Sequence, residues 1–222
     1  MPRSIVQDIL KRSDAVMVIE EARTVLEEEA RRRQAFHEWL SPSVKAEFIQ
    51  GEVVIHSPAK RAHLDISGHI YRLLSVFVDV HKAGAVSVEK AMVQLSRNDY
   101  EPDVCYWGKE KAATFTQETM MHPAPDLIVE VLSKSTQKND RGIKMDDYAL
   151  HGVQEYWIVD PWQKRVEQYG LLSPQDRSYL LFEKYGFADE ITARVLPDFV
   201  VPVAAFFDAA ENVRVLQSLL RF

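Results

Sequence analysis

The sequence contains little cysteine, little glycine and no long apolar run. One of its 222 residues is a cysteine, Cys105, so no disulfide can form within the chain and a cysteine-ligated zinc site is excluded. With eight glycines and no GxxxxGK(S/T), GxGxxG or GxSxG pattern, the common nucleotide-binding loops and the hydrolase nucleophile elbow are excluded. No stretch approaches the roughly 20 apolar residues of a transmembrane helix. We therefore expect a cytoplasmic protein that does not contact a membrane.

The charge balance is acidic, with 27 lysines and arginines against 33 aspartates and glutamates and a net charge of -6. This balance argues against a protein that coats nucleic acid, because phosphate binding depends on concentrated Lys and Arg. It does not exclude an enzyme whose centre needs carboxylates. Residues 27–29 are glutamates and residues 31–33 are arginines. Each arginine therefore comes four residues after a glutamate, and on a helix the two side chains of each such pair are neighbours that can form an ion pair. We expect a salt-bridged, solvated face there.

The hydrophobic pattern predicts an N-terminal helical arm over residues 1–40, ended by Ser41-Pro42, and a single domain over 41–222. Within the domain, the expected elements are two strands around Gln50-Gly51, a helix over 63–80, a hairpin over 84–107, a loop over 111–125, a strand over 126–132, a helix over 139–150, a strand over 155–161, a β-meander over 165–197 and a C-terminal helix within 201–220. Helices on either side of a central strand indicate an α/β fold with a mixed sheet flanked by helices.

Two acidic residues stand in apolar strands. Glu130 lies within LIVEVL, where both faces of the strand should be buried, and an isolated carboxylate there would cost several kcal/mol. Asp103 lies in a similar setting, within PDVCYW. If the two strands are neighbours, the acids converge at one end of the sheet, where a divalent cation would relieve their repulsion. The alternative is that Asp103 caps a turn after Pro102 and that Glu130 pairs with a nearby Arg or Lys.

These segments resemble a known group of proteins. PDVCYW, APDLIVEVLSKST and HGVQEYWIVDP, together with Asp140, Lys144 and Tyr148, are similar to the restriction-endonuclease-like, or PD-(D/E)XK, superfamily and within it to the Uma-two family. The resemblance covers roughly residues 36 to 207. It implies an αβββαβ core, a divalent-metal site and phosphodiester hydrolysis. In that pattern Asp103 and Glu130 match the two metal-binding acids.

The chain departs from the superfamily pattern at the lysine expected two residues after the glutamate, where it has Leu132. Lys144 is the candidate replacement, since Asp140, Lys144 and Tyr148 share one face at helical spacing and could overhang the strand end. Lys134 is nearer in sequence and is expected on a loop. The alternative for Lys144 is an ordinary i, i+4 pair with Asp140.

Two further residues match the family pattern more loosely. Glu47, in AEFIQGEVV, and His63, at the start of the long predicted helix, correspond to acidic and histidine positions near the site. A histidine at a helix start is also commonly solvated or a cap. No other histidines pair at metal-ligand spacing, so a histidine zinc site is not expected.

The function expected from these features is a metal-dependent endonuclease that hydrolyses DNA with Mg²⁺ or Mn²⁺ held by Asp103 and Glu130, and with Lys144 near the reacting phosphate. DNA binding should be weak and metal-dependent, supported by basic residues near the site, which are Lys134, Lys138, Arg141 and Lys144. The alternative is a catalytically inert binding or assembly protein that keeps the nuclease fold. Four aromatic residues, Trp157, Trp162, Phe206 and Phe207, favour a homodimer, although Trp157 also suits a core position.

Overall fold

The computed structural model describes residues 5–41 and 43–220, and the chain separates into two compact units, Met1–Ile55 and His56–Phe222. Residues 1–4 and Pro42, which belong to the predicted arm and its end, lie outside the described residues. The predicted division into an arm over 1–40 and one domain over 41–222 stays a prediction. Within the described residues, no helix combines the length and apolar character needed to cross a bilayer.

Over its described residues, the first unit contains two helices and a β-hairpin. Helix α1 (Ile5–Leu10) is separated from α2 (Ala15–Trp39) by a short turn in which Arg12 binds the Asp14 carboxylate at 2.7 and 2.8 Å, so the arm is interrupted. Strands β1 (Ala46–Ile49) and β2 (Glu52–Ile55) pair antiparallel. Gln50 and Gly51 join them with φ angles of 49° and 87°, as a tight hairpin with two left-handed residues requires. The predicted turn is confirmed.

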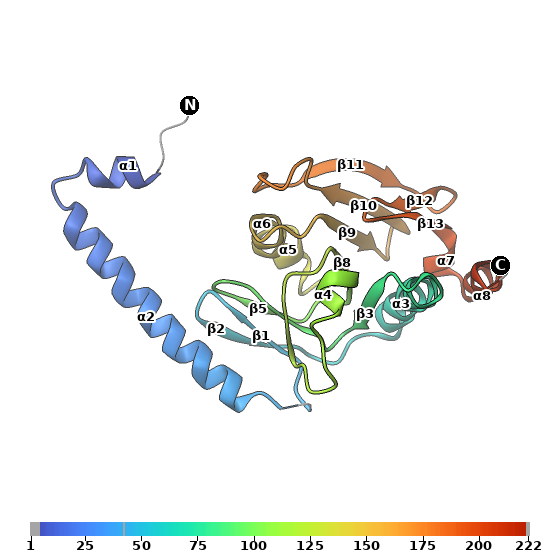
Figure 1. The fold of residues 1–222 in the computed structure, drawn as a ribbon, viewed down its shortest axis with the longest axis horizontal. Coiled ribbons are helices and arrows are strands. Elements are labelled where there is room, and N and C mark those ends of the chain that lie inside the picture. The colour runs from blue at the N-terminus through green and yellow to red at the C-terminus, as the bar shows by residue number, and fades with distance from the viewer. Residues whose placement is uncertain (1–4, 42, 221–222) are drawn as a thin grey trace. The chain divides into compact units, whose positions relative to one another are not determined.

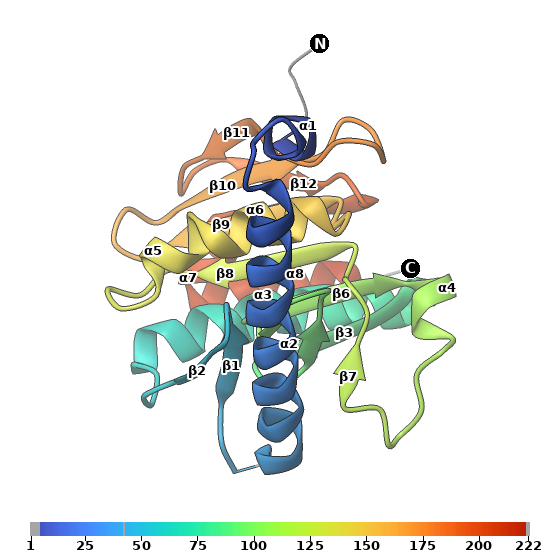
Figure 2. The same cartoon turned by 90° about the vertical axis from the view of Figure 1, so that its left-hand side faces the viewer.

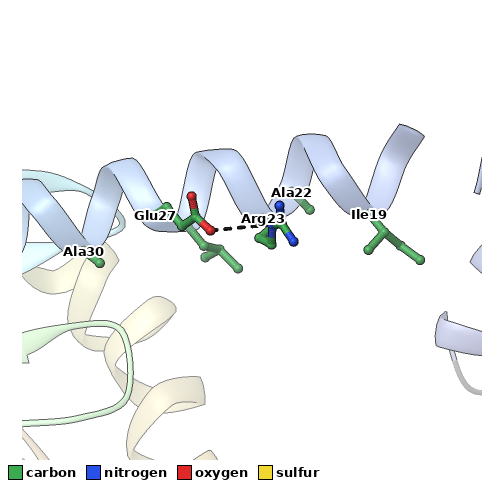
Figure 3. Close-up of a pocket in the computed structure, with 6 residues that line it drawn as sticks. Ile19, Ala22, Arg23, Glu27 and Ala30 are labelled. Atoms are coloured by element: carbon green, nitrogen blue, oxygen red, sulfur yellow. Dashed lines mark ion pairs between the residues drawn. The ribbon is translucent and has the colours of Figure 1, made fainter. Parts of the chain in front are cut away.

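One face of α2 carries a small apolar stripe (Figure 3). Side chains at helical spacing line a pocket there, and they are Ile19, Ala22, Arg23, Leu26, Glu27 and Ala30. Arg23 and Glu27, two of these residues, form an i, i+4 ion pair at 3.5 Å. Ile19 and Leu26 remain 45% and 51% exposed. Charged pairs flank the apolar stripe, as on an ordinary solvated amphipathic helix.

The second unit is built on a six-stranded mixed sheet in the order β11-β10-β9-β8-β6-β3 (Figure 2). Its strands are β3 (Gly84–Val88), β6 (Val104–Gly108), β8 (Leu127–Val131), β9 (Glu155–Asp160), β10 (Arg165–Gly170) and β11 (Leu180–Tyr185). β8 and β9 are parallel, whereas the other neighbours in this sheet are antiparallel. With α3 (Arg61–His81) before β3 and α6 (Ile143–Leu150) between β8 and β9, the chain order is the predicted αβββαβ.

Helices cover both faces of this sheet (Figure 1). The apolar residues of α3 recur at helical spacing and pack with alternate sheet residues such as Val104, Val129 and Trp157 in the main core. Two C-terminal helices, α7 (Ala204–Phe207) and α8 (Ala209–Leu219), join that side. The opposite side faces α6, which contacts the intervening residue Glu130. A strand buried on both faces explains the nearly continuous apolar run around Glu130.

Several elements differ in detail from the sequence prediction. The predicted hairpin over 84–107 contains two further short strands, β4 (Met92–Gln94) and β5 (Asp99–Tyr100), which pair with each other. The predicted loop over 111–125 begins within α4 (Lys109–Ala112) and contains β7 (Met121–His122), which pairs with β4. The predicted helix over 139–150 divides into α5 (Gln137–Asp140) and α6 at Gly142. The end of the meander, β12 (Glu190–Ala193), pairs instead with β13 (Leu196–Pro202) in a separate sheet.

Candidate active site

Asp103 and Glu130 lie at the same end of neighbouring strands. β6 and β8 pair antiparallel with Val104 opposite Val129, and continuing this register by one residue brings Asp103 opposite Glu130. Opposite residues on antiparallel strands project from the same side of a sheet. One Asp103 oxygen also accepts the backbone N–H of Val131 at 2.8 Å, which fixes the carboxylate at the strand end. β6 and β8 are therefore the neighbours that the predicted convergence of the two acids requires.

Glu130 is buried, and side chains of α6 compensate its charge. Its Oε1 atom accepts hydrogen bonds from Lys144 Nζ and from the Tyr148 hydroxyl, each at 3.0 Å. Glu130 and Lys144 are each 3% exposed. Removing one member of such a pair leaves a buried charge, which typically costs about 3–5 kcal/mol. The pairing of Glu130 with a nearby base, considered as an alternative above, is thus present, and the base is the lysine proposed for the site.

Lys144 lies between two carboxylates. Its Nζ atom is 3.7 Å from Asp140 Oδ1 in addition to its contact with Glu130. The helix break at Gly142 separates Asp140 from Lys144, yet all three predicted residues of this face are buried here, with Tyr148 one turn further along α6. The i, i+4 pair with Asp140 and the contact with Glu130 therefore coexist.

The other candidate lysine is placed differently. Lys134 is exposed in the turn that follows β8. Leu132, at the position where the superfamily pattern has lysine, is buried and donates its N–H to the carbonyl of Val159 at 2.9 Å. The geometry favours Lys144 over Lys134 as the lysine associated with Glu130.

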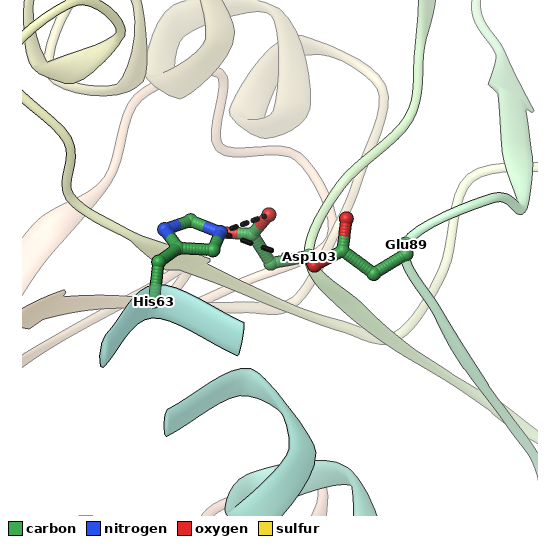
Figure 4. A group of neighbouring side chains, drawn as sticks. All are labelled: His63, Glu89 and Asp103. Carbon is green, nitrogen blue, oxygen red and sulfur yellow. Dashed lines mark hydrogen bonds and ion pairs between the residues drawn. The ribbon is translucent and has the colours of Figure 1, made fainter. Parts of the chain in front are cut away.

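The second oxygen of Asp103 faces a histidine and another acid (Figure 4). His63, near the start of α3, places Nε2 at 3.1 Å from Asp103 Oδ1 and at 3.9 Å from Glu89 Oε1. One potential ligand atom from each of these residues lies within 4.8 Å of the others. The side chains are 15%, 7% and 24% exposed for His63, Asp103 and Glu89. His63 is therefore a half-buried partner of Asp103, unlike the solvated or capping residue weighed above.

Glu89 is the member of this group that the sequence analysis did not identify. It follows β3, where Val88 is opposite Val104, so the next step of the register brings Glu89 opposite Asp103. Its backbone N–H donates to the Asp103 carbonyl at 3.0 Å, and its φ of 65° is left-handed. In the sequence, the only indication of this role is that an acidic residue directly follows the GAVSV strand. The pairing of β3 with β6 is what brings that residue next to Asp103.

Glu47 lies on β1 in the first unit, opposite Val54 of β2. Its assignment to the site stays a prediction, because the site residues described above all belong to the second unit.

The electrostatics of the α6 side of the sheet are dominated by carboxylates. Burial raises the pKa of Tyr156 well above its ordinary value, and the charges of Glu130, Asp140 and Asp103 raise it further. The Tyr156 hydroxyl donates to the Asp140 carbonyl at 2.9 Å. Tyr156 is thus a neutral hydrogen-bond donor at neutral pH, and the three acids act on one common region.

The donors in this region fit a divalent cation. Carboxylate oxygens suit Mg²⁺ and Mn²⁺, and an imidazole nitrogen suits first-row transition metals. Asp103 belongs both to the pair with Glu130 and to the group with His63 and Glu89, so a cation held by Asp103 could draw on either. The lysine ammonium on the Glu130 side supplies a fixed positive charge nearby.

The chain order α3-β3-β6-β8-α6-β9, with acids at the shared end of β6 and β8, defines a nuclease-like fold of the restriction-endonuclease class. A solved structure with this fold, a "putative nuclease belonging to DUF820" from Anabaena variabilis ATCC 29413, has a TM-score of 0.65 and 16% identity, and the match covers 78% of this chain and 94% of that one. Residues 33–204 match the family model Uma2, described as "Putative restriction endonuclease". The chain belongs to the Uma2 family.

A curated relative extends the comparison to Synechocystis sp. (strain ATCC 27184 / PCC 6803 / Kazusa). Its "Uncharacterized protein sll1609" is 33% identical over 150 residues, which are 66% of this chain and 82% of that protein. The resemblance inferred from the PDVCYW and EVLSKST segments is therefore confirmed at the level of the family and of the fold.

Proposed function

We propose that this protein is a metal-dependent endonuclease that hydrolyses phosphodiester bonds in DNA. The observation that carries the proposal is the Asp103 carboxylate bound to the Val131 N–H, next to Glu130 at the shared end of β6 and β8, with Lys144 bound to Glu130. The description of the Uma2 family and the nuclease title of the structural neighbour support the same class of activity.

In this proposal each side chain has a separate task. Asp103 and Glu130 are the acids that hold Mg²⁺ or Mn²⁺, as predicted from the family pattern. The cation supplies a Lewis acid that neutralises charge developing on the phosphate and acidifies water. Lys144 provides a positive charge beside the scissile phosphate, and Tyr148 keeps the Glu130 carboxylate in a fixed orientation through its hydrogen bond.

The surface near the site is consistent with light binding of DNA. Of the four basic residues expected to assist, Arg141 is engaged by Glu167 at 2.7 Å and Lys144 is buried. Lys134 and Lys138 are exposed. Binding of DNA by Lys and Arg side chains gains free energy from the counterions that the DNA releases. With few exposed basic side chains near the site, we expect the affinity for DNA to be low and to fall as the salt concentration rises.

The test is cleavage of supercoiled plasmid DNA with Mg²⁺ or Mn²⁺. Asp103→Asn and Glu130→Gln should each reduce the rate at least about 100-fold, the scale of losing one electrostatic contact to a transition state. Asp146→Asn, which changes an exposed acid on α6, is the matched control and should leave the rate unchanged. Cleavage that persists in both site variants would refute the proposed residues.

The alternative is an inert binding or assembly protein with the nuclease fold. Two observations favour it, namely the buried Leu132 in place of the superfamily lysine and the salt bridge that already satisfies one Glu130 oxygen. A folded protein that cleaves no DNA with either cation at any salt concentration would support this alternative.

The predicted homodimer and the cytoplasmic location also stand as proposals. Trp157 and Phe206, two of the four aromatics that favoured a dimer, are fully buried in the core, as weighed for Trp157 above. Trp162 is 54% exposed and is the better candidate for an interface. Elution as a 25.5 kDa species in sizing chromatography would contradict the homodimer.

A further inference from the structure

We propose that His63, Glu89 and Asp103 form a three-ligand cation site that prefers Mn²⁺, or a neighbouring first-row transition ion, over Mg²⁺. The assignment deepens the proposed function and rests on it for the role of the cation. The binding itself is a property of three side chains and can be measured without DNA.

The spacing of the donor atoms matches that of ligands around one ion. Metal–ligand bonds of about 2.0–2.3 Å place neighbouring ligand atoms about 3 to 4 Å apart. His63 Nε2 is 3.1 Å from Asp103 Oδ1 and 3.9 Å from Glu89 Oε1. The three side chains point toward one another from different elements, which are α3, the residue after β3 and the bend before β6 (Figure 4).

Each of these three residues makes a hydrogen bond that involves a backbone group and does not depend on the side chains of the other two. The remaining Asp103 oxygen is held by the Val131 N–H at 2.8 Å. Glu89 is held in a left-handed conformation by its N–H bond to the Asp103 carbonyl. His63 lies in the first turn of the 21-residue helix α3, where Ser67 Oγ binds its carbonyl at 3.0 Å. Ligands held in place before binding lose little conformational entropy when the cation arrives.

The charges of the group also call for a cation. Glu89 directly follows β3 and Asp103 directly precedes β6, both side chains are largely withdrawn from solvent, and the Glu89 N–H donates to the Asp103 carbonyl at 3.0 Å. Two carboxylates so close repel each other, and a divalent ion relieves the repulsion. A neutral imidazole adds a donor without adding a third negative charge.

The imidazole decides which cation is preferred. Mg²⁺ takes oxygen ligands and retains waters, whereas nitrogen donors strengthen binding of Mn²⁺ and the metals that follow it. A group with one nitrogen and two carboxylates therefore discriminates against Mg²⁺, although the pair Asp103 and Glu130 alone would accept it.

The experiment is calorimetric titration of the full chain with MnCl₂ and MgCl₂ in the absence of DNA. We expect Mn²⁺ to bind about tenfold or more tightly than Mg²⁺. His63→Gln should abolish this preference by weakening Mn²⁺ binding, and Glu89→Gln should weaken both ions about tenfold or more. Electron spin echo spectra of bound Mn²⁺ should show a directly coordinated nitrogen in the parent protein and none in His63→Gln.

His151→Gln is the matched control. His151 Nδ1 also lies beside a carboxylate, 3.3 Å from Asp147 Oδ1, but no third ligand gathers around that pair among the residues that the structure describes. The control should bind both ions like the parent. Circular dichroism verifies folding, and His63→Asn serves if His63→Gln does not fold.

The outcomes separate this site from the nuclease. Equal affinity for the two ions, or a nitrogen signal that persists in both His63 variants, would overturn the site. Mn²⁺ binding that depends on His63 and Glu89 supports the site even if no DNA is cleaved, and in that case the proposed function alone fails. DNA cleavage with binding unaffected by either variant would instead retain the nuclease and reject this site.

Discussion

The two acids at the end of β6 and β8 have contrasting surroundings. Glu130 is enclosed by α6, where a lysine and a tyrosine both bind one of its oxygens. Asp103 faces a histidine and a glutamate that are 15% and 24% exposed. The chain itself therefore supplies the positive charge for one acid, whereas the other acid lies among donors suited to an external cation. Two acids in one sequence pattern can thus have different partners, a lysine and a tyrosine for Glu130 and a histidine and a second acid for Asp103.

The largest expected effect tests the buried pair of Glu130 and Lys144. Lys144→Met should lower the free energy of unfolding by about 3–5 kcal/mol, because it leaves the buried Glu130 carboxylate without its cation. Lys134→Met, an exposed position in the turn after β8, should change it by less than about 0.5 kcal/mol. Urea unfolding followed by circular dichroism measures both. Equal losses of stability in the two variants would show that Lys144 does not compensate a buried charge on Glu130.

The next effect tests the group formed by His63, Glu89 and Asp103. Mn²⁺ at about 100 times its dissociation constant should raise the free energy of unfolding by about 2.7 kcal/mol, because it binds only the folded chain. Thermal unfolding of the parent protein and of Glu89→Gln at one fixed Mn²⁺ concentration measures the increment. A tenfold weaker site in Glu89→Gln should lose about 1.3 kcal/mol of this increment. An increment equal to that of the parent protein would show that the ion is bound elsewhere.

A smaller effect sharpens the role of Tyr148. Tyr148→Phe removes one hydrogen bond to an ionised carboxylate and should cost about 1.5 kcal/mol. Repeating the change in a Glu130→Gln background should cost less, since the acceptor is then neutral. A double-mutant cycle by urea unfolding gives the coupling, and a coupling of zero would mean that Tyr148 contributes only packing.

The smallest effect comes from an ion pair outside both groups. Burial opposes ionisation of Glu167, but hydrogen bonds from Arg141 and Tyr169 outweigh it and lower its pKa to about 2. Because the folded pKa lies below the unfolded value of 4.5, this stabilisation is nearly complete at pH 6 and is lost progressively as pH falls through 4.5 toward 2. We expect a loss of about 1 kcal/mol between pH 6 and pH 4. Glu167→Gln should flatten that part of the stability profile, and an unchanged profile would refute the assignment.

The fold was predictable wherever a strong period or an apolar run was present. The helix expected over 63–80 is α3, and the strands around Glu130 and Trp157 are β8 and β9. The break at Gly142 and the extra strands β4 and β5 were missed, because short elements depend on tertiary pairing more than on local preference. Glu89 was missed for the same reason, since its partner Asp103 is defined by strand register and not by sequence distance.

The parallel pairing of β8 with β9 also has a kinetic consequence. The crossover between them, residues 132–154, contains α5 and α6 and must close before the two strands can pair. Lys144 reaches Glu130 only when that crossover has packed on the sheet. We therefore expect the buried charge pair to form after the main folding barrier, so that Lys144→Met accelerates unfolding in stopped-flow experiments and leaves the refolding rate nearly unchanged. The pair would then slow unfolding and so prolong the lifetime of the folded site.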